Sequence, residues 1–123
     1  QKKIQMFQKI LRIQTIQKIQ MMTDEASRVL GLLGLARRAG RLAVGMSAVE
    51  SMASQASKLL VVVASDLSDA RKEKISRMAV NAIMLTDLVD SKELAKAFNR
   101  KELVIVAIDS HAFISGIVGK KKN

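Results

Sequence analysis

Two short apolar runs decide which architecture is open to this chain. The segments LLVVVA at residues 59–64 and LVIVAI at residues 103–108 are continuous, rich in β-branched residues and flanked by polar or charged residues. Such runs predict strands that are buried on both faces, and these strands need helices above and below their sheet. The shorter segments RLAV at residues 41–44 and AIML at residues 82–85 predict two further strands.

Segments with helical signals separate these strands. Residues 25–39 are rich in Leu and Ala and stop at Gly40, which suits a left-handed C-cap. Ser47 and Glu50 predict a capping box at the start of a second helix, and Asp90 with Glu93 predicts another that opens a helix through Phe98.

The two remaining helices are predicted from caps and apolar spacing. Ser65 and Asp66 are expected to cap a charged helix, and Ser110 is expected to start a last helix that ends near Gly119. The apolar face of the charged helix comprises Ile75, Met78, Ala79 and Ala82. Helices that alternate with strands predict an α/β fold: a three-layer α/β/α sandwich with a small mixed four-stranded sheet.

The positive charge is unevenly distributed. Of the formal net charge of +10, residues 1–21 carry five bases and no acid, and three lysines lie in residues 120–122, which leaves +2 for residues 22–119. Residues 26–49 nevertheless contain Arg28, Arg37, Arg38 and Arg41 and no acid. These arginines form either a solvated face or a patch that contacts phosphates.

Residues 4–21 repeat with a period of three, with Ile or Phe first and Gln usually second. Because an α-helix has about 3.6 residues per turn, this apolar stripe would wind around a helix instead of staying on one face. We therefore expect residues 1–21 to be a low-complexity basic extension that is either an RNA- or membrane-contacting arm or not native. Residues 22–119 are expected to form the domain, and residues 120–123 a basic tail.

The residue types exclude several kinds of chemistry. The chain has no Cys and a single His, so a cysteine metal site or a histidine-rich cluster cannot form. The adjacent residues Asp109, Ser110 and His111 cannot adopt the geometry of a hydrolase triad. No P-loop and no GxGxxG sequence is present. We expect no enzyme activity, no metal and no cofactor.

The length of the apolar runs and the number of aromatic residues also limit the classes of partner that this chain can bind. The longest apolar run has six residues, far too few to cross a bilayer, so a cytoplasmic protein that does not bind membranes is expected. Phe7, Phe98 and Phe113 are the only aromatic residues, too few for a platform that stacks single-stranded RNA. Binding of a folded RNA stays open.

Three motifs in order carry a family resemblance. They are LGLARRAGRLAVG at residues 33–45, KLLVVVASDLSD at 58–69 and LAKAFNRKELVIVAIDSHAF at 94–113. Together they resemble the L7Ae/L30e ribosomal protein family, and within it the short bacterial YlxQ-like members, over about residues 28–118. The resemblance implies an α/β/α sandwich that binds kink-turn RNA or ribosomal RNA in association with the ribosome. We expect the protein to be a monomer.

The resemblance implies a first contact region at the start of the second helix. Kink-turn binders of this family usually have Gly-x-Asn-Glu-x-x-Lys there, and this chain keeps Gly45 but has Ser47, Ala48 and Ser51 at the three polar positions. Ala48 cannot accept a hydrogen bond from a guanine edge, and each missing base contact weakens recognition by about 1–3 kcal/mol. Glu50 lies about 200° around the helix from Ala48 and is no substitute.

The second implied region is the loop before the last strand. Arg100 and Lys101 could reach phosphates there, Asn99 stands where Gly is common and tolerates a left-handed backbone, and Leu103 with Val104 could pack against an extruded base. The complete predicted RNA surface is Arg37, Arg38, Arg41, Gly45, Met46, Ser47, Ala48, Ser51, Asn99, Arg100, Lys101, Leu103 and Val104.

A second hypothesis uses the same fold without kink-turn recognition. Met46, Ala48 and Val49 make the start of the second helix more apolar than the family motif. A protein-interaction module that has lost kink-turn recognition is therefore the alternative to an RNA-binding protein.

Overall fold

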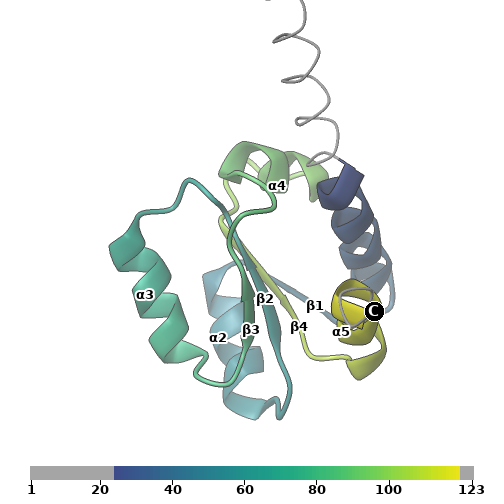
Figure 1. Cartoon of the computed structure of the whole chain (residues 1–123), viewed down its shortest axis with the longest axis horizontal. Coiled ribbons are helices and arrows are strands. Elements are labelled where there is room, and N and C mark those ends of the chain that lie inside the picture. Colours follow the sequence, from purple (N-terminus) through teal and green to yellow (C-terminus); the bar gives the residue numbers. More distant parts are fainter. Residues whose placement is uncertain (1–23, 120–123) are drawn as a thin grey trace, which may run out of the picture.

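The computed structural model describes residues 24–119 and forms five helices and a four-stranded mixed sheet (Figure 1). The first helix covers residues 24–38 of the described part. The other elements are β1 (Leu42–Val44), α2 (Met46–Gln55), β2 (Leu60–Val63), α3 (Asp69–Met78), β3 (Ile83–Leu85), α4 (Ser91–Ala97), β4 (Ile105–Ile108) and α5 (His111–Val118). The predicted extension at residues 1–21, its boundary at residue 22 and the tail at residues 120–123 lie outside the described residues.

The strand order in the sheet is β1-β4-β2-β3. Strand β4 is antiparallel to both β1 and β2, whereas β2 and β3 are parallel. Val44 pairs with Val106, and Val63 pairs with Ile105. The last residues of β1 and β2 therefore meet at the end of the sheet where β4 begins, which we call the β4-start end.

The sheet forms the middle of three layers. All residues of β2 and β4 are buried, and alternate side chains enter opposite cores. Leu60 and Val106 pack with the first helix, α4 and α5, whereas Val61 and Ile105 pack with α2 and α3. Figure 1 shows α2 and α3 on one side of the sheet and the first helix with α5 on the other. The predicted three-layer α/β/α sandwich is thus confirmed.

The predicted capping box at Ser47 and Glu50 is wrong. The N-cap of α2 is Gly45, with φ 91°, and Ser47 lies inside the helix. The chain turns at Gly45 directly after β1, so α2 begins at Met46. Ser47 therefore already lies inside the helix, and its hydroxyl cannot serve as the N-cap. Gly45 has no side chain, so no side chain caps α2.

The predicted start of the charged helix is also wrong. The N-cap of α3 is Ser68, whose hydroxyl accepts a hydrogen bond from the Arg71 amide at 3.3 Å. Ser65 and Asp66 stay outside this helix because both bond elsewhere: the Ser65 amide donates to the Val89 carbonyl, and Asp66 binds Ser91. The helix also ends at Met78, so Ala79 and Ala82, expected on its apolar face, follow it.

Three local predictions are confirmed. Gly40 and Asn99 have φ values of 72° and 54°, in the left-handed region. The Asp90 carboxylate accepts a hydrogen bond from the Glu93 amide at 2.8 Å, which confirms Asp90 as the N-cap of α4, although this helix ends at Ala97 and Phe98 is its C-cap. These positions could be predicted because each depends on residues nearby in the sequence.

Arg28 connects the two helices of one outer layer. Its guanidinium donates to the carbonyls of Gly116 and Ile117 near the end of α5 and to the Glu25 carboxylate, at 3.1–3.2 Å. We expect Arg28→Ala to lower the free energy of unfolding by about 1–2 kcal/mol, because these carbonyls at a helix C-terminus favour a cation. Urea unfolding followed by circular dichroism measures this loss.

Arg77→Ala is the matched control for Arg28→Ala. Arg77 forms only an exposed ion pair with Glu73, and its side chain is 77% exposed, against 25% for Arg28. The control is expected to cost less than about 0.5 kcal/mol. Equal losses for the two variants would contradict a bridging role for Arg28.

Candidate nucleic-acid interface

The β4-start end brings the two predicted contact regions together. The Gly45 amide, just before α2, donates to the Ile105 carbonyl at 3.0 Å, and the Ala64 amide donates to the Val104 carbonyl at 2.8 Å. The start of α2 is thereby held against the end of the 99–104 loop. One ligand could contact both regions.

The three altered family positions share one exposed face of α2. Ser47, Ala48 and Ser51 are all exposed, and their helical spacing places them within about one quarter of a turn of each other. Gly45 and Met46 are half-buried. Because no side chain caps α2, its first amides are free of a side-chain partner in the described structure. These amides and the two hydroxyls can bind an anion.

The 99–104 loop starts from a defined helix end. The Asn99 amide donates to the Lys96 carbonyl and the Arg100 amide to the Ala95 carbonyl, at 3.3 and 2.8 Å. This pair of bonds around a left-handed Asn99 is the Schellman motif. The geometry fixes the direction in which the exposed Arg100 leaves α4.

The first helix ends in the same way. The Gly40 amide donates to the Arg37 carbonyl at 3.0 Å, and the Arg41 amide donates to the Ala36 carbonyl at 2.8 Å. Arg41 thus follows a left-handed residue, as Arg100 does, and it is also exposed. Two helix ends of the same geometry each present one arginine.

Arg37 joins these two helix ends. Its Nη1 donates to the Phe98 carbonyl at 3.4 Å, and its guanidinium carbon lies 5.8 Å from the centre of the Phe98 ring. A cation at this distance from a ring is attracted by the ring's negative face. The Phe98 side chain is buried, so it supports Arg37 from the core.

Not every predicted site residue is available for contact. Leu103 is only 4% exposed and belongs to the core, so its side chain already packs inside the protein. Val104 is half-buried at the surface, whereas Arg38 and Lys101 are exposed. Arg41 and Gly45 stand at opposite ends of the three-residue strand β1, about 13 Å apart by strand rise.

The cations of this surface are free of carboxylate partners in the part of the chain that the structure describes. The ion pairs found between residues 24 and 119 are Arg28–Glu25 and Arg77–Glu73. The unpaired cations of the surface are Arg37, Arg38, Arg41, Arg100 and Lys101. Unpaired cations can neutralise phosphates without breaking an internal ion pair.

Asp66 ties α4 to the loop that follows β2. Its carboxylate accepts hydrogen bonds from the Ser91 hydroxyl at 2.7 Å and from the Ser91 amide at 2.9 Å. The bond from the Ser91 hydroxyl, helped by the amide, holds the pKa of Asp66 below its ordinary value of 3.8. The charged carboxylate therefore stabilises the start of α4.

The lowered pKa predicts a pH-dependent contribution from Asp66. The stabilisation is present above pH 3.8, declines as the pH falls below that value, and is lost once the pH passes the lower folded-state pKa. We expect Asp66→Asn to be less stable than the parent at pH 7 and equally stable in strong acid. Urea midpoints at the two pH values test this, and a pH-independent difference would contradict it.

Within residues 24–119, the hydrogen-bond partner of the His111 ring is a lysine. His111 is the first residue of α5, and its Nδ1 lies 3.4 Å from the Nζ of Lys58. No group of three His, Cys, Asp or Glu side chains that could hold a metal occurs within residues 24–119. Over the same residues, no helix has the length and apolar character to cross a membrane.

Reasoning from the sequence missed one feature next to this surface. Arg71 and Lys74 of α3 line a groove that also contains Met46. Their spacing of three on an amphipathic helix beside Ile75 and Met78 was the available signal. This spacing does not show that α2 forms the other wall of the groove.

The comparisons with known proteins agree with this fold. The model of the ribosomal protein L7Ae/L30e/S12e/Gadd45 family matches residues 27–114. A Bacillus halodurans protein described as having unknown function is similar in structure, with a TM-score of 0.60 and 22% identity over 78% of this chain and 98% of that one. The Giardia lamblia 15.5kD RNA binding protein has a TM-score of 0.58 and 16% identity, covering 80% and 88%. No curated protein matches the sequence.

Proposed function

Because this chain belongs to the ribosomal protein L7Ae/L30e/S12e/Gadd45 family, we propose that it is a non-catalytic cytoplasmic protein that binds structured RNA as a monomer. The proposed RNA is ribosomal RNA or a kink-turn-like element, and the ribosome is the proposed setting. The observation that carries the proposal is the β4-start end, where uncapped α2 and the cationic 99–104 loop are held together through Gly45 and Ile105. The RNA-binding description of the Giardia lamblia structure supports it.

The proposed mode of binding divides the surface into two tasks. Arg37, Arg38, Arg41, Arg100 and Lys101 bind phosphates, together with the first amides of α2. Ser47 and Ser51 can donate or accept at a base edge, whereas the methyl group of Ala48 cannot. Val104 packs against an extruded base. Binding therefore depends mostly on phosphates and shape.

The first experiment titrates a labelled kink-turn RNA and an unkinked duplex of the same length into the protein at two salt concentrations. Preferential binding of the kinked RNA would show that the Ser47, Ala48 and Ser51 face still reads this motif. Equal binding to both RNAs would support phosphate-directed binding and withdraw the kink-turn specificity. Binding to neither RNA would contradict the proposal and favour the protein-interaction module.

Arg41 and Arg100 provide a direct test of the surface. We expect Arg41→Ala with Arg100→Ala to weaken RNA binding about tenfold or more at low salt and to reduce the slope of log K against log salt by about 1.5–2, because each arginine neutralises about one phosphate. Fluorescence anisotropy at several salt concentrations measures both effects.

The control double variant removes the same charge from two residues outside the proposed RNA surface. Lys58 lies just before β2, and Arg77 lies in the last turn of α3; both are exposed. Lys58→Ala with Arg77→Ala is expected to leave the affinity within about twofold and the salt slope nearly unchanged. Identical effects of the two double variants would remove Arg41 and Arg100 from the proposed RNA surface.

A further inference from the structure

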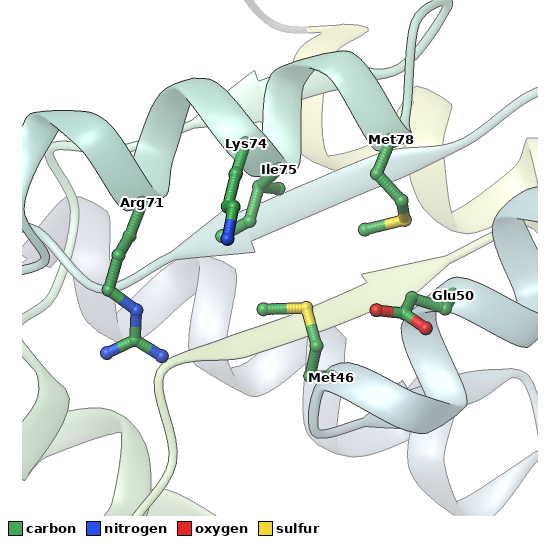
Figure 2. Close-up of a pocket in the computed structure, with 6 residues that line it drawn as sticks. All are labelled: Met46, Glu50, Arg71, Lys74, Ile75 and Met78. Atoms are coloured by element: carbon green, nitrogen blue, oxygen red, sulfur yellow. The ribbon is translucent and has the colours of Figure 1, made fainter.

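A groove lies between α2 and α3, on the layer that carries the start of α2 (Figure 2). Its volume is about 390 Å³, within the range of small-ligand pockets. The lining residues are Met46 and Glu50 of α2 and Arg71, Lys74, Ile75 and Met78 of α3. Met46 alone of these belongs to the surface proposed above.

The groove changes in chemical character along its length. In Figure 2 the guanidinium of Arg71 and the carboxylate of Glu50 lie at opposite ends, with the Met46 side chain between them. The amine of Lys74 points into the groove on the Arg71 side, and Met78 lies above Glu50. A ligand that fits this order has an anionic end, a flat apolar middle and an end rich in hydrogen-bond donors.

The three charged groups that line the groove have no ion-pair partner in the part of the chain that the structure describes. Arg71 and Lys74 lie farther than 4 Å from any carboxylate between residues 24 and 119. Glu50 also lies farther than 4 Å from any cation among these residues. All three residues are exposed. They therefore face the same solvent-filled space and can bind one ligand without losing an internal ion pair.

We propose that this groove binds a guanine nucleotide, either free or as an unpaired nucleotide of the RNA. Arg71 and Lys74 bind the phosphate, since both donate charge-assisted hydrogen bonds to phosphate oxygens. The base lies against the side chains of Met46 and Met78, and the thioethers adapt to its shape. The Watson–Crick edge faces Glu50.

The carboxylate of Glu50 selects guanine. An ionised carboxylate has two oxygens that only accept hydrogen bonds, and guanine presents two neighbouring donors, N1–H and the N2 amino group. Adenine presents a donor beside the N1 acceptor, which would face the carboxylate unfavourably. Inosine keeps N1–H and lacks the amino group, so it loses one of the two bonds.

The groove continues the proposed RNA surface. Met46 is the first residue of α2, and Arg71 lies in the first turn of α3. Both helices begin at the β4-start end, because α2 follows β1 and α3 follows β2. The phosphate end of the groove thus faces the surface that binds the RNA backbone. In its RNA form, this inference rests on the proposed function.

Methionine methyl groups report directly on the groove. The full chain is labelled with ¹³C-methyl methionine and titrated with guanosine 5′-monophosphate. The methyl resonances of Met46 and Met78 are expected to shift saturably, while those of Met52 and Met84, which lie outside the groove lining, stay in place. Inorganic phosphate and guanosine are each expected to bind at least about tenfold more weakly.

Two variants test the two ends of the groove. Lys74→Glu is expected to weaken guanosine 5′-monophosphate binding about tenfold, because it replaces an attraction to phosphate by a repulsion. Glu50→Gln is expected to abolish the preference over inosine 5′-monophosphate. Lys92→Glu is the charge-matched control on α4 and is expected to leave binding unchanged. The proposal is overturned if two results occur together. The first is that guanosine 5′-monophosphate leaves Met46 and Met78 unshifted or shifts them no more than inorganic phosphate does. The second is that Met78 also stays unshifted in a titration with RNA.

A titration with RNA distinguishes the two sources of the nucleotide. Met78 is the reporter, because Met46 also belongs to the RNA surface. Shifts with the free nucleotide support a mononucleotide ligand, and shifts only with an RNA that carries an unpaired G, and not with its A variant, support an RNA nucleotide. RNA binding without any Met78 shift, combined with no response to the nucleotide, overturns this inference alone. Nucleotide shifts without RNA binding overturn the proposed function alone.

Discussion

The triple variant Ser47→Asn, Ala48→Glu and Ser51→Lys is expected to bind kink-turn RNA about 100-fold more tightly than the parent chain, with little gain for an unkinked duplex. The three residues restore the polar positions that kink-turn binders of this family usually carry. Each correct polar contact to a base contributes about 1–3 kcal/mol, and two such contacts already supply the expected factor.

The structure offers these side chains a suitable position. All three residues are exposed on one face of α2, beside Gly45 and free of side-chain hydrogen bonds in the described structure. The Ser51 carbonyl, which accepts from the Ser54 hydroxyl at 2.7 Å, is unchanged by Ser51→Lys. The substitutions therefore alter the surface without removing buried atoms, and the stability is expected to change by less than about 0.5 kcal/mol.

The matched control places the same new residues at the other end of the helix. Ser54→Asn, Gln55→Glu and Ser57→Lys introduce the same side chains and the same net charge at exposed positions in and after the last turn of α2. No gain in kink-turn binding is expected for this control. If the first triple variant bound no better than the control, the start of α2 would not be the base-reading face, whatever the chain does with phosphates.

The layers of the fold could be predicted because they depend on apolar patterns that persist along the chain. The runs around Val62 and Val106 are apolar at every position, so both faces had to be covered. The left-handed Gly40 and Asn99 could be predicted for a similar reason, since each follows a helical pattern directly.

The errors occur where distant residues decide the local geometry. Ser47 and Ser65 look like caps within their own segments, but backbone hydrogen bonds to distant residues fix Gly45 against Ile105 and Ser65 against Val89. The groove at Arg71 could not be predicted, because its opposite wall comes from α2. The burial of Leu103 could not be predicted for the same reason, because an apolar residue at the end of an apolar run can lie either in the core or on the surface.

Phe98→Ala is expected to have the largest effect on stability of the single substitutions considered, lowering the free energy of unfolding by about 3–5 kcal/mol. The Phe98 side chain is 3% exposed and packs in the core between the first helix, α4 and the sheet. Removing a buried ring loses its transfer free energy and leaves a cavity. Urea unfolding followed by circular dichroism measures the loss, and a loss below about 1 kcal/mol would contradict the packing described.

Two further variants separate the roles that meet at Phe98. Phe98→Leu keeps most of the apolar volume and is expected to cost less than Phe98→Ala, so it provides a folded protein if the alanine variant unfolds. Arg37→Ala removes the cation above the ring but is expected to cost less than about 1 kcal/mol, because Arg37 is exposed.

RNA binding by these two variants tests how the core supports the surface. Phe98 ends α4 directly before the left-handed Asn99, and its carbonyl accepts the Arg37 hydrogen bond. If this helix end sets the direction of Arg100, Phe98→Leu should reduce the salt slope of binding less than Arg100→Ala does, and Arg37→Ala should reduce it by about one phosphate at most. If Arg37→Ala kept the salt slope of the parent chain, Arg37 would hold the two helix ends together without binding phosphate. Phosphate binding would then depend on Arg41 and Arg100, which follow these helix ends.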